Sequence, residues 1–429
     1  MRNLPGIALV FVAAAVLAVA GCAPRTSDTE ITVWTMWTGQ EEKNFEAVLR
    51  RYEQLHPGVH IRNLGAVSDD TKTVRAIVAG VPPDFFTIAD ASYLGPLARN
   101  NAILPLDDLF RHSTLKESSF VPAALGMCRY HGALYGLPFL IDGTALIWNR
   151  GDFKAAGLPP DEPPRTLEQY ADMAVKLSTK GPDGSITRLG VNPLDDINLV
   201  IHLFGGRLTD PVTGRITADD PANVAAVTWY KEFTDRLGGV EKVRAFASGF
   251  GQSQGVSNPF YVDKISMMDG GEWNPYWLSR YAPNLSYGVA PMPPPAAHPE
   301  LANSTWMGGN VFCIPKESRH PKEAWDFLVW TQSVEAQVMF AKRMNNVPNQ
   351  RAALTAPQLI KGASYRSMYA KFLKLADTPN AGYFPVLPVS RMYISELGNA
   401  LDKVLYGDLT PAAALAGVRV RVQRELDRS

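Results

Sequence analysis

The alternation of strand-like and helix-like segments in the first third of the chain restricts its fold more than any other feature. Residues 31–36 (ITVWTM) form an apolar, β-branched run, as expected of a strand buried on both faces. Apolar residues then recur at spacings of three and four, which predicts a helix that ends at residues 56–58 (HPG). Residues 59–64 and 84–89 predict further strands, with a helix at 70–79 between them. This βαβαβ order predicts an α/β fold with a mostly parallel sheet, helices on both faces and ligands outside the carboxyl ends of the strands.

The pattern continues farther along the chain. Residues 144–149 (TALIWN) predict another buried strand, and Thr166 is placed as the N-cap of a helix. We predict further helices at residues 221–237, 321–332 and 390–405.

The chain begins with an apolar run that ends at a cysteine. Residues 7–21 are apolar, follow Arg2 and are too few to span a bilayer, so we expect residues 1–21 to be a signal peptide. The small residues before Cys22 resemble the bacterial lipobox, which implies a lipid on Cys22 and a polar tether over residues 22–30. An ordinary secretory signal with an incidental cysteine is the alternative.

Composition excludes several classes of function. Lys plus Arg equals Asp plus Glu at 42 each, so no basic field favours nucleic acid. Cys128 and Cys313 lie far apart in sequence with no nearby histidine pair, and we expect no metal site and no cofactor. A disulfide between them requires Cα atoms roughly 4.4 to 6.8 Å apart. The sequence leaves that bond open.

Eight segments carry a family likeness that covers nearly all of the chain after the predicted signal peptide. In order and spacing they resemble the sugar-type extracellular solute-binding proteins of bacterial ABC importers. The segments are HPGVHIRNL, GVPPDFFTIADASYLGPLARNNAILPLDDL, HGALYGLPFLIDGTALIWNRGDFKAAGL, RTLEQYADMAVKL, SMMDGGEWNPYW, YGVAPMPPP, WMGGNVFCIPKESRHPKEAWDFLVW and NVPNQRAAL.

The resemblance implies a periplasmic-binding-protein fold of two α/β lobes, each a mostly parallel sheet flanked by helices, joined by three crossings. We place the crossings near residues 141–143, 307–310 and 388–390. Lobe 1 then comprises residues 31–141 and 310–388, and lobe 2 comprises residues 142–309 and 389–429.

The resemblance also implies a function. We expect an exported, lipid-anchored monomer, on the outer face of the cytoplasmic membrane or in the periplasm. Its lobes would close on a carbohydrate, a di- or oligosaccharide, and deliver it to ABC permease subunits in the membrane. Such a protein needs a cleft of aromatic rings and hydrogen-bonding groups and no catalytic residue.

Candidate ligand contacts follow the first predicted strand. Trp37 is placed to stack on a sugar face, while Gln40 and Glu41 are placed to bond its hydroxyls. The alternative is a helix N-cap at Thr38 with Trp37 packed beside it as a hydrophobic staple.

The family pattern implies further contacts after the third strand and at the first crossing. Asp90 and Ser92 follow that strand, although Asp90 also suits a simple helix N-cap. Asp142 lies at the first crossing, where relatives often place a carboxylate against sugar hydroxyls. In the segment MMDGGEWNPYW, Glu272 and Trp273 offer a carboxylate and a large ring, unless Trp273 is buried against Trp277.

The remaining candidates lie at the later crossings and in one variable loop. They are Trp306, Gly309 and Asn310 at the second crossing, Asp196 in the loop NPLDDINLV, and Arg391 and Tyr393 after the third crossing.

The sequence also allows functions other than sugar capture. A polyol or glycerol-phosphate ligand would use Arg391 to hold its anion. A lipid-anchored glycoside hydrolase would need two carboxyl groups roughly 5 to 10 Å apart, for which Asp142 and Glu272 are the pair to consider. A lipoprotein that binds sugar only to signal is a third class. GQSQG, around Ser253, matches a serine-hydrolase motif in letters only, because no buried strand precedes it.

Overall fold

The computed structural model describes residues 28–65, 67, 70–193, 196–250 and 255–429. The predicted signal peptide, Cys22 and Ser253 lie outside these residues. In the part of the chain that is described, no helix is both long enough and apolar enough to cross a membrane.

The larger sheet, which forms the first lobe, has the strand order β13-β6-β12-β3-β1-β2, with β14 beside β12. Its strands are β1 (Thr29–Trp34), β2 (Val59–Leu64), β3 (Phe85–Ile88), β6 (Leu137–Gly143), β12 (Thr305–Cys313), β13 (Val347–Pro348) and β14 (Ala381–Gly382). β1 pairs in parallel with β2 and β3, as the βαβαβ pattern predicts. The sheet as a whole is mixed rather than mostly parallel, because β12 lies antiparallel to both β3 and β6.

The second lobe contains a smaller sheet with no parallel pair among its three strands. β7 (Ala145–Asn149) lies between β10 (Met267–Gly270) and β11 (Tyr287–Ala290), and both pairings are antiparallel. The expectation of a mostly parallel sheet in each lobe is therefore wrong for this lobe. The other strands of the described residues form two small antiparallel hairpins. β4 (Arg129–Tyr130) pairs with β5 (Ala133–Leu134), and β8 (Thr179–Lys180) pairs with β9 (Ile186–Arg188).

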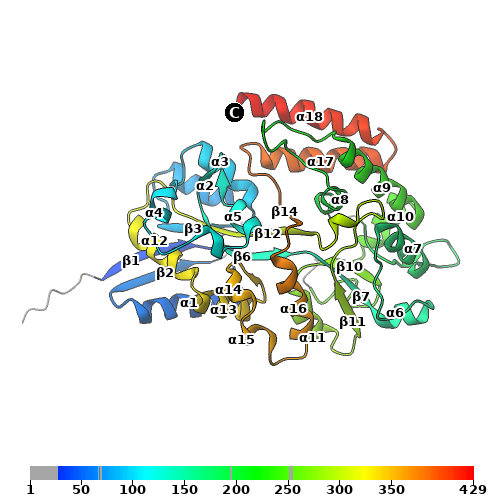
Figure 1. The fold of residues 1–429 in the computed structure, drawn as a ribbon, viewed down its shortest axis with the longest axis horizontal. Helices are drawn as coiled ribbons and strands as arrows, with labels where there is room; N and C mark the ends of the chain where they lie inside the picture. Colours follow the sequence, from blue (N-terminus) through cyan, green and yellow to red (C-terminus); the bar gives the residue numbers. More distant parts are fainter. Residues whose placement is uncertain (1–27, 66, 68–69, 194–195, 251–254) are drawn as a thin grey trace, which may run out of the picture.

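Helices flank both sheets, and Figure 1 shows the two lobes side by side with α17 and α18 over the second. The helices are α1 (Gly39–Leu55), α2 (Asp70–Val78), α3 (Leu94–Arg99), α4 (Asp107–Arg111), α5 (Pro122–Gly126), α6 (Arg150–Ala155), α7 (Leu167–Leu177), α8 (Ile197–Leu203), α9 (Pro221–Leu237), α10 (Val240–Ala247), α11 (Asn274–Tyr281), α12 (Pro321–Thr331), α13 (Val334–Met344), α14 (Arg351–Leu354), α15 (Pro357–Ile360), α16 (Arg366–Ala376), α17 (Ser390–Leu405) and α18 (Pro411–Arg428). The predicted bounds of α9 and α17 agree with the structure, and Thr166 caps α7 by accepting from the Gln169 backbone N–H.

Aromatic side chains form the centre of the first lobe. Phe45, on the buried face of α1, packs against Phe139 of β6, Phe312 of β12 and Phe340 of α13, with ring centroids 6.0, 6.3 and 6.2 Å apart. All four rings are fully buried. The helix-period pattern of α1 therefore sets which face of the sheet it covers.

Two long strands, β6 and β12, continue from the first lobe toward the second. They pair at Gly143 with Met307 and at Ile141 with Gly309, and the register then shifts before Val311. β7 of the second lobe begins at Ala145, directly after β6. These strands lie where we expect the first two crossings, and a bulge of this kind bends the strand that carries it.

The lobe boundaries stay a prediction, and one helix complicates them. α16 falls in the sequence range assigned to the first lobe, yet it contacts α11 and β11 of the second. Tyr369 and Phe372 of α16 belong to the same buried cluster as Trp148 of β7.

Cys128 and Cys313 are both buried in the first lobe, and no disulfide joins them. Burial raises the pKa of the Cys128 thiol well above its ordinary value, and the nearby Cys313 raises it further. Both side chains therefore act as small apolar core residues here.

Gly309 and Gly398 provide a test of the strand junction. Gly309 has a φ of +146°, and a Cβ there would lie 2.4 Å from the Leu140 carbonyl oxygen. We expect Gly309→Ala to lower the free energy of unfolding by about 2 kcal/mol or more, since it combines backbone strain with a steric clash.

Gly398 is the matched control, because a Cβ at this site on α17 meets nothing within 4 Å. Gly398→Ala should stabilise the protein by about 0.5 to 1 kcal/mol through helix propensity. Chemical denaturation measures both changes, and equal effects of the two substitutions would contradict this account of the junction.

Candidate functional site

A cavity of about 240 Å³ lies between the two lobes, at the ends of α1 and α13 on one side and the start of α11 on the other. The predicted contacts that line it are Trp37, Gln40, Glu41, Asp142, Trp273 and Asn310. Residues almost three hundred positions apart in the sequence therefore meet in one cleft, as the family likeness implies.

The first-lobe wall begins with Trp37. Its side chain is 5% exposed, and its ring packs 4.8 Å from Phe45 and 5.2 Å from Phe139. Thr38 makes no side-chain capping bond. Of the two readings of Trp37, the geometry favours a packed core ring that lines the cavity without standing free in it.

Polar groups complete this wall. Gln40 donates to the Asn44 side-chain oxygen at 3.2 Å, and partial burial raises the pKa of Glu41. Asn310 on β12 donates to the Met36 sulfur and to the Ala89 carbonyl oxygen. These groups offer a ligand several hydrogen-bonding partners from one side.

Two carboxyl groups meet at the base of the cavity. Asn346, just beyond α13, donates through its amide nitrogen to Asp142 Oδ1 at 2.7 Å and to Glu272 Oε1 at 2.9 Å. The backbone N–H of Gly143 donates to Glu272 Oε2 at 3.0 Å. Glu272 has no exposed surface, whereas Asp142 is only partly buried and lines the cavity.

The surroundings raise the pKa of both carboxyl groups. Burial raises the pKa of Asp142 to about 6, partly opposed by hydrogen bonds from Asn346 and Glu272, and the charge of Glu41 raises it further. Burial also raises the pKa of Glu272 well above its ordinary value, and the Asp142 charge adds to that shift. At neutral pH the pair cannot hold two charges without a large cost.

The second-lobe wall is aromatic. A Cβ on Gly271 would lie 2.3 Å from the Trp273 ring, so this glycine makes the space that the ring occupies. Tyr276 and Trp277 line the same cavity from the first turn of α11. Trp277 stacks on Tyr281 at 5.5 Å, and Trp273 itself is half-buried with a face toward the cavity.

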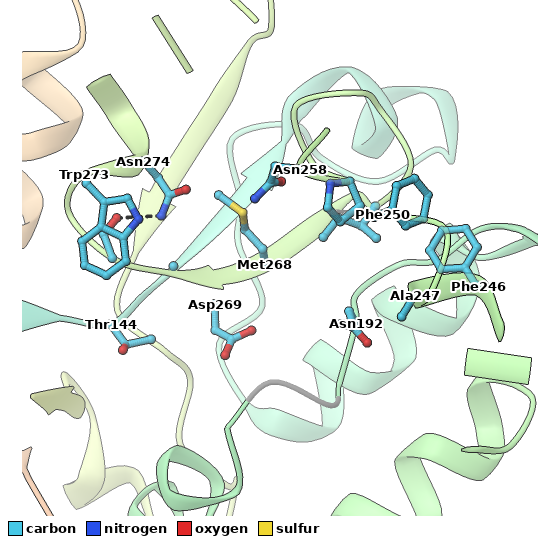
Figure 2. A pocket seen from close by; sticks show the side chains of 14 residues that line it. Thr144, Asn192, Phe246, Ala247, Phe250, Asn258, Met268, Asp269, Trp273 and Asn274 are labelled. Atoms are coloured by element: carbon cyan, nitrogen blue, oxygen red, sulfur yellow. Dashed lines mark hydrogen bonds between the residues drawn. The ribbon is translucent and has the colours of Figure 1, made fainter. Parts of the chain in front are cut away.

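Trp273 also lines a second cavity, of about 430 Å³, inside the second lobe. Figure 2 shows Trp273 at one end of it and Phe246 and Phe250 at the other, with Met268 and Asp269 between them. The Asn274 amide donates to the Gly271 carbonyl at 2.9 Å, which fixes the turn that carries Trp273. One ring therefore borders both the cleft and a larger pocket beside it.

Four predicted contacts lie outside the cleft cavity. Asp90 accepts from the Ser92 backbone N–H as the N-cap of a short 3-10 helix (Ala91–Tyr93), and Ser92 is 2% exposed. Arg391 lies 3.8 Å from Asp90 and 4.5 Å above the Tyr93 ring. Tyr393 is fully buried and donates to the Leu208 carbonyl.

The other predicted contacts also lie elsewhere. Asp196 caps α8 by accepting from the backbone N–H groups of Asn198 and Leu199. Trp306 lines a separate cavity of about 620 Å³, with its ring 5.7 Å from His202. Gly309 is buried within β12.

Several cavity residues were not predicted: Asn44, Tyr276, Trp277, Arg343, Asn345 and Asn346. The signal for Tyr276 and Trp277 is their spacing of three and four residues after Trp273, which places all three at one helix end. The paired asparagines after α13, with Asn345 in a left-handed conformation at φ 59°, are the signal for the opposite wall. Among the described residues, no group of His, Cys, Asp and Glu side chains has the arrangement of a metal site.

The raised pKa of Asp142 predicts a pH-dependent stability. The Asp142 carboxyl group binds its proton more tightly in the folded state than in the unfolded chain. The folded protein therefore loses stability as pH rises from about 4 toward 6, by up to about 1.4 kcal/mol per unit of pKa shift. Asp142→Asn should remove that loss, so its thermal midpoint relative to wild type should rise between pH 4 and pH 7.

Asp183→Asn is the control of opposite sign, because hydrogen bonds from Ser185 lower the pKa of Asp183. Removing the Asp183 carboxylate should reduce stability at pH 7 and should have less effect as pH falls toward 3. Parallel pH curves for Asp142→Asn and wild type would contradict the assignment.

Comparison with known proteins identifies the family to which this chain is similar. A family model described as bacterial extracellular solute-binding protein matches residues 38–338. An arabinooligosaccharide-binding protein of Bacillus subtilis is 25% identical over 354 residues, which are 78% of this chain and 77% of that protein. A maltotriose-binding protein of Pyrococcus abyssi is 23% identical over 335 residues, 77% of this chain and 68% of that protein.

Solved structures agree on the fold. CpMnBP1 with mannobiose bound is 28% identical, with a TM-score of 0.78 over 92% of this chain and 100% of that chain. The sugar-binding protein MalE of Xanthomonas citri, at 18% identity, has a TM-score of 0.76 over 93% of this chain and 98% of that one. With its two lobes and the match over most of its length, the chain belongs to the family of bacterial extracellular solute-binding proteins.

Proposed function

We propose that this protein captures a di- or oligosaccharide in the cleft between its lobes and delivers it to the permease of an ABC importer. The observation that carries the proposal is the meeting of Trp273 and Asp142 in one cavity. An aromatic face suits the apolar face of a sugar ring, and a carboxylate oxygen suits its hydroxyls. The relative CpMnBP1, solved with mannobiose and with mannotriose, supports a ligand of this class.

The pocket behind Trp273 favours an oligosaccharide. It adds about 430 Å³ to the space next to the cleft, and its far end carries the rings of Phe246 and Phe250. A chain of sugar units with one unit on Trp273 has room to extend into either cavity.

Capture needs closure, and closure needs contacts from both lobes. A ligand that touches the first-lobe wall and Trp273 stabilises only the closed arrangement, so binding shifts the population of shapes. We propose β6, β12 and the segment around residues 388–390 as the hinges of this motion. A permease that recognises the closed shape then distinguishes loaded from empty protein.

The alternatives receive less support from the site. For a hydrolase, Glu272 would have to reach substrate, yet it is sealed from solvent and both its oxygens accept hydrogen bonds. For a glycerol-phosphate ligand, Arg391 lies on Asp90 outside the cavity, although Arg343 lines it. A glycerol-3-phosphate-binding protein of Escherichia coli matches over only 38% of this chain.

We also propose that Cys22 carries the lipid that holds the protein on the outer face of the cytoplasmic membrane or in the periplasm. Two or more acyl chains, at about 0.8 kcal/mol per buried methylene, suffice for stable anchoring.

A panel of saccharides tests the proposed ligand. We expect mannobiose, mannotriose, maltotriose or arabino-oligosaccharides to raise the thermal midpoint, because binding to the folded state alone stabilises it. The same sugars should release no new reducing ends. The panel includes glycerol 3-phosphate, and a response to that compound alone would overturn the carbohydrate assignment.

Substitution of two tryptophans locates the site. Trp273→Ala should weaken the best saccharide by about tenfold or more, since aromatic anchors are worth at least about 1.4 kcal/mol. Trp306→Ala is the matched control, because this half-buried ring lines a different cavity. Calorimetric titration that shows equal losses for the two variants would rule out Trp273 as the specific platform.

The anchor has its own test. Cys22→Ser should move the protein from the membrane fraction to the soluble exported fraction, with saccharide affinity unchanged. If the wild-type protein is already soluble and carries no acyl mass, the lipid assignment is wrong.

A further inference from the structure

The carboxyl pair at the base of the cleft is joined by one amide. Asn346 Nδ2 donates one hydrogen bond to Asp142 and one to Glu272, with nitrogen–oxygen distances of 2.7 and 2.9 Å. Because a single nitrogen contacts both oxygens, the two carboxyl groups are near neighbours. Asp142 belongs to β6 and Glu272 to the turn after β10, so the pair lies where the two lobes join.

Charges around the pair do not neutralise it. Glu41, at the start of α1, is negative and raises the pKa of Asp142. Tyr369 of α16 donates to the Asn346 carbonyl. Burial raises the pKa of Tyr369, Glu272 raises it further, and Arg366 lowers it. Arg343, at the end of α13, lines the cavity but is exposed, where water screens its charge. Two neighbouring carboxyl groups in a buried site without a neutralising positive charge hold one proton between them, because ionising both is too costly.

We propose that Asp142 and Glu272 hold one proton between them at neutral pH, and that Glu272, as the neutral acid, positions the Asp142 carboxylate to accept a ligand hydroxyl. Glu272 is thus a positioning residue that does not touch the ligand. The role of Asp142 as acceptor rests on the proposed function, whereas the shared proton does not.

The surroundings of the two Glu272 oxygens differ. Glu272 Oε2 accepts from the Gly143 backbone N–H and so is the carbonyl oxygen of the acid. We place the hydrogen on Glu272 Oε1, because this oxygen shares the Asn346 amide with Asp142 and the Glu272 side chain hydrogen-bonds with that of Asp142. Asp142 keeps the charge because it retains contact with the cavity and with solvent, whereas Glu272 has none.

The shared proton makes ligand affinity depend on pH. When pH rises past the pKa of Glu272, its donor is lost and a second negative charge faces Asp142. Affinity should then fall by about tenfold per pH unit, since only the singly protonated pair presents the acceptor correctly. When pH falls below about 6, Asp142 gains a proton and ceases to be an anionic acceptor. The affinity profile is bell-shaped.

The proton is tested first without any sugar. Carbon-13 NMR of ligand-free protein, labelled at Asp and Glu carboxyl carbons, should show one glutamate signal at the neutral-acid position at pH 7. Glu272→Gln should delete that signal, and Asp142→Asn should lower the pH at which it titrates, because a repelling charge is gone. The proposal is overturned if every carboxyl carbon is ionised by pH 6, or if neither variant changes the signal.

The positioning role is tested with mannotriose, or with whichever saccharide of the panel binds most tightly. Glu272→Ala should weaken binding by about tenfold at pH 7, as expected when a buried hydrogen-bonded partner is removed. Glu272→Gln, which keeps a neutral donor, should restore most of this loss and remove the fall at alkaline pH. Glu300→Gln, at an exposed carboxylate, should keep the wild-type profile.

A flat wild-type profile from pH 6 to 9, or an unchanged alkaline fall in Glu272→Gln, would contradict the positioning role. If no saccharide binds at all, the proposed function fails, and the NMR titration still decides where the proton lies.

Discussion

The antiparallel pairing of β6 with β12 is the interaction on which the rest of the structure depends. β6 ends just before β7 of the smaller sheet begins, and β12 pairs with β6 there, so one short ladder connects the two buried cores. Buried amides secure this ladder from the first-lobe side: Asn349 donates to the Pro138 and Phe139 carbonyls, and Gln337 donates to Phe139 as well. Side-chain donors thus satisfy buried backbone acceptors of β6.

The cleft takes its chemistry from the same place. Asp142 is the penultimate residue of β6, and Gly143 beside it supplies the N–H that holds Glu272. The Asp142 carboxyl group is therefore carried by the junction itself, and Glu272, in the turn after β10, is bound to the junction through the Gly143 N–H. Trp273 directly follows Glu272 in the chain, so the aromatic wall is attached to the same turn.

Local patterns predicted much of the fold and only part of the site. The βαβαβ unit, α9 and α17 follow from apolar periodicity and from turn residues, which act over a few positions. The mixed sheet does not follow, because β12 reaches its place through pairing with strands more than 150 residues earlier. Glu272 in a glycine-rich turn has the composition of a ligand contact, yet it is buried since Asn346 and Gly143 satisfy its oxygens. Asp90 and Asp196 likewise cap helices, a role that competes with ligand binding for the same residue types.

The way Trp273 is seated bears on how such proteins diverge. Its ring rests directly on Gly271, where any side chain would occupy the same space, and Asn274 closes the turn behind it. This wall has no freedom to change without losing the ring. The facing wall, at the start of α1 and the end of α13, carries polar side chains, among them Gln40, Asn44 and Arg343. We therefore expect a change of sugar preference to arise by substitution in that wall, with the Trp273 platform kept.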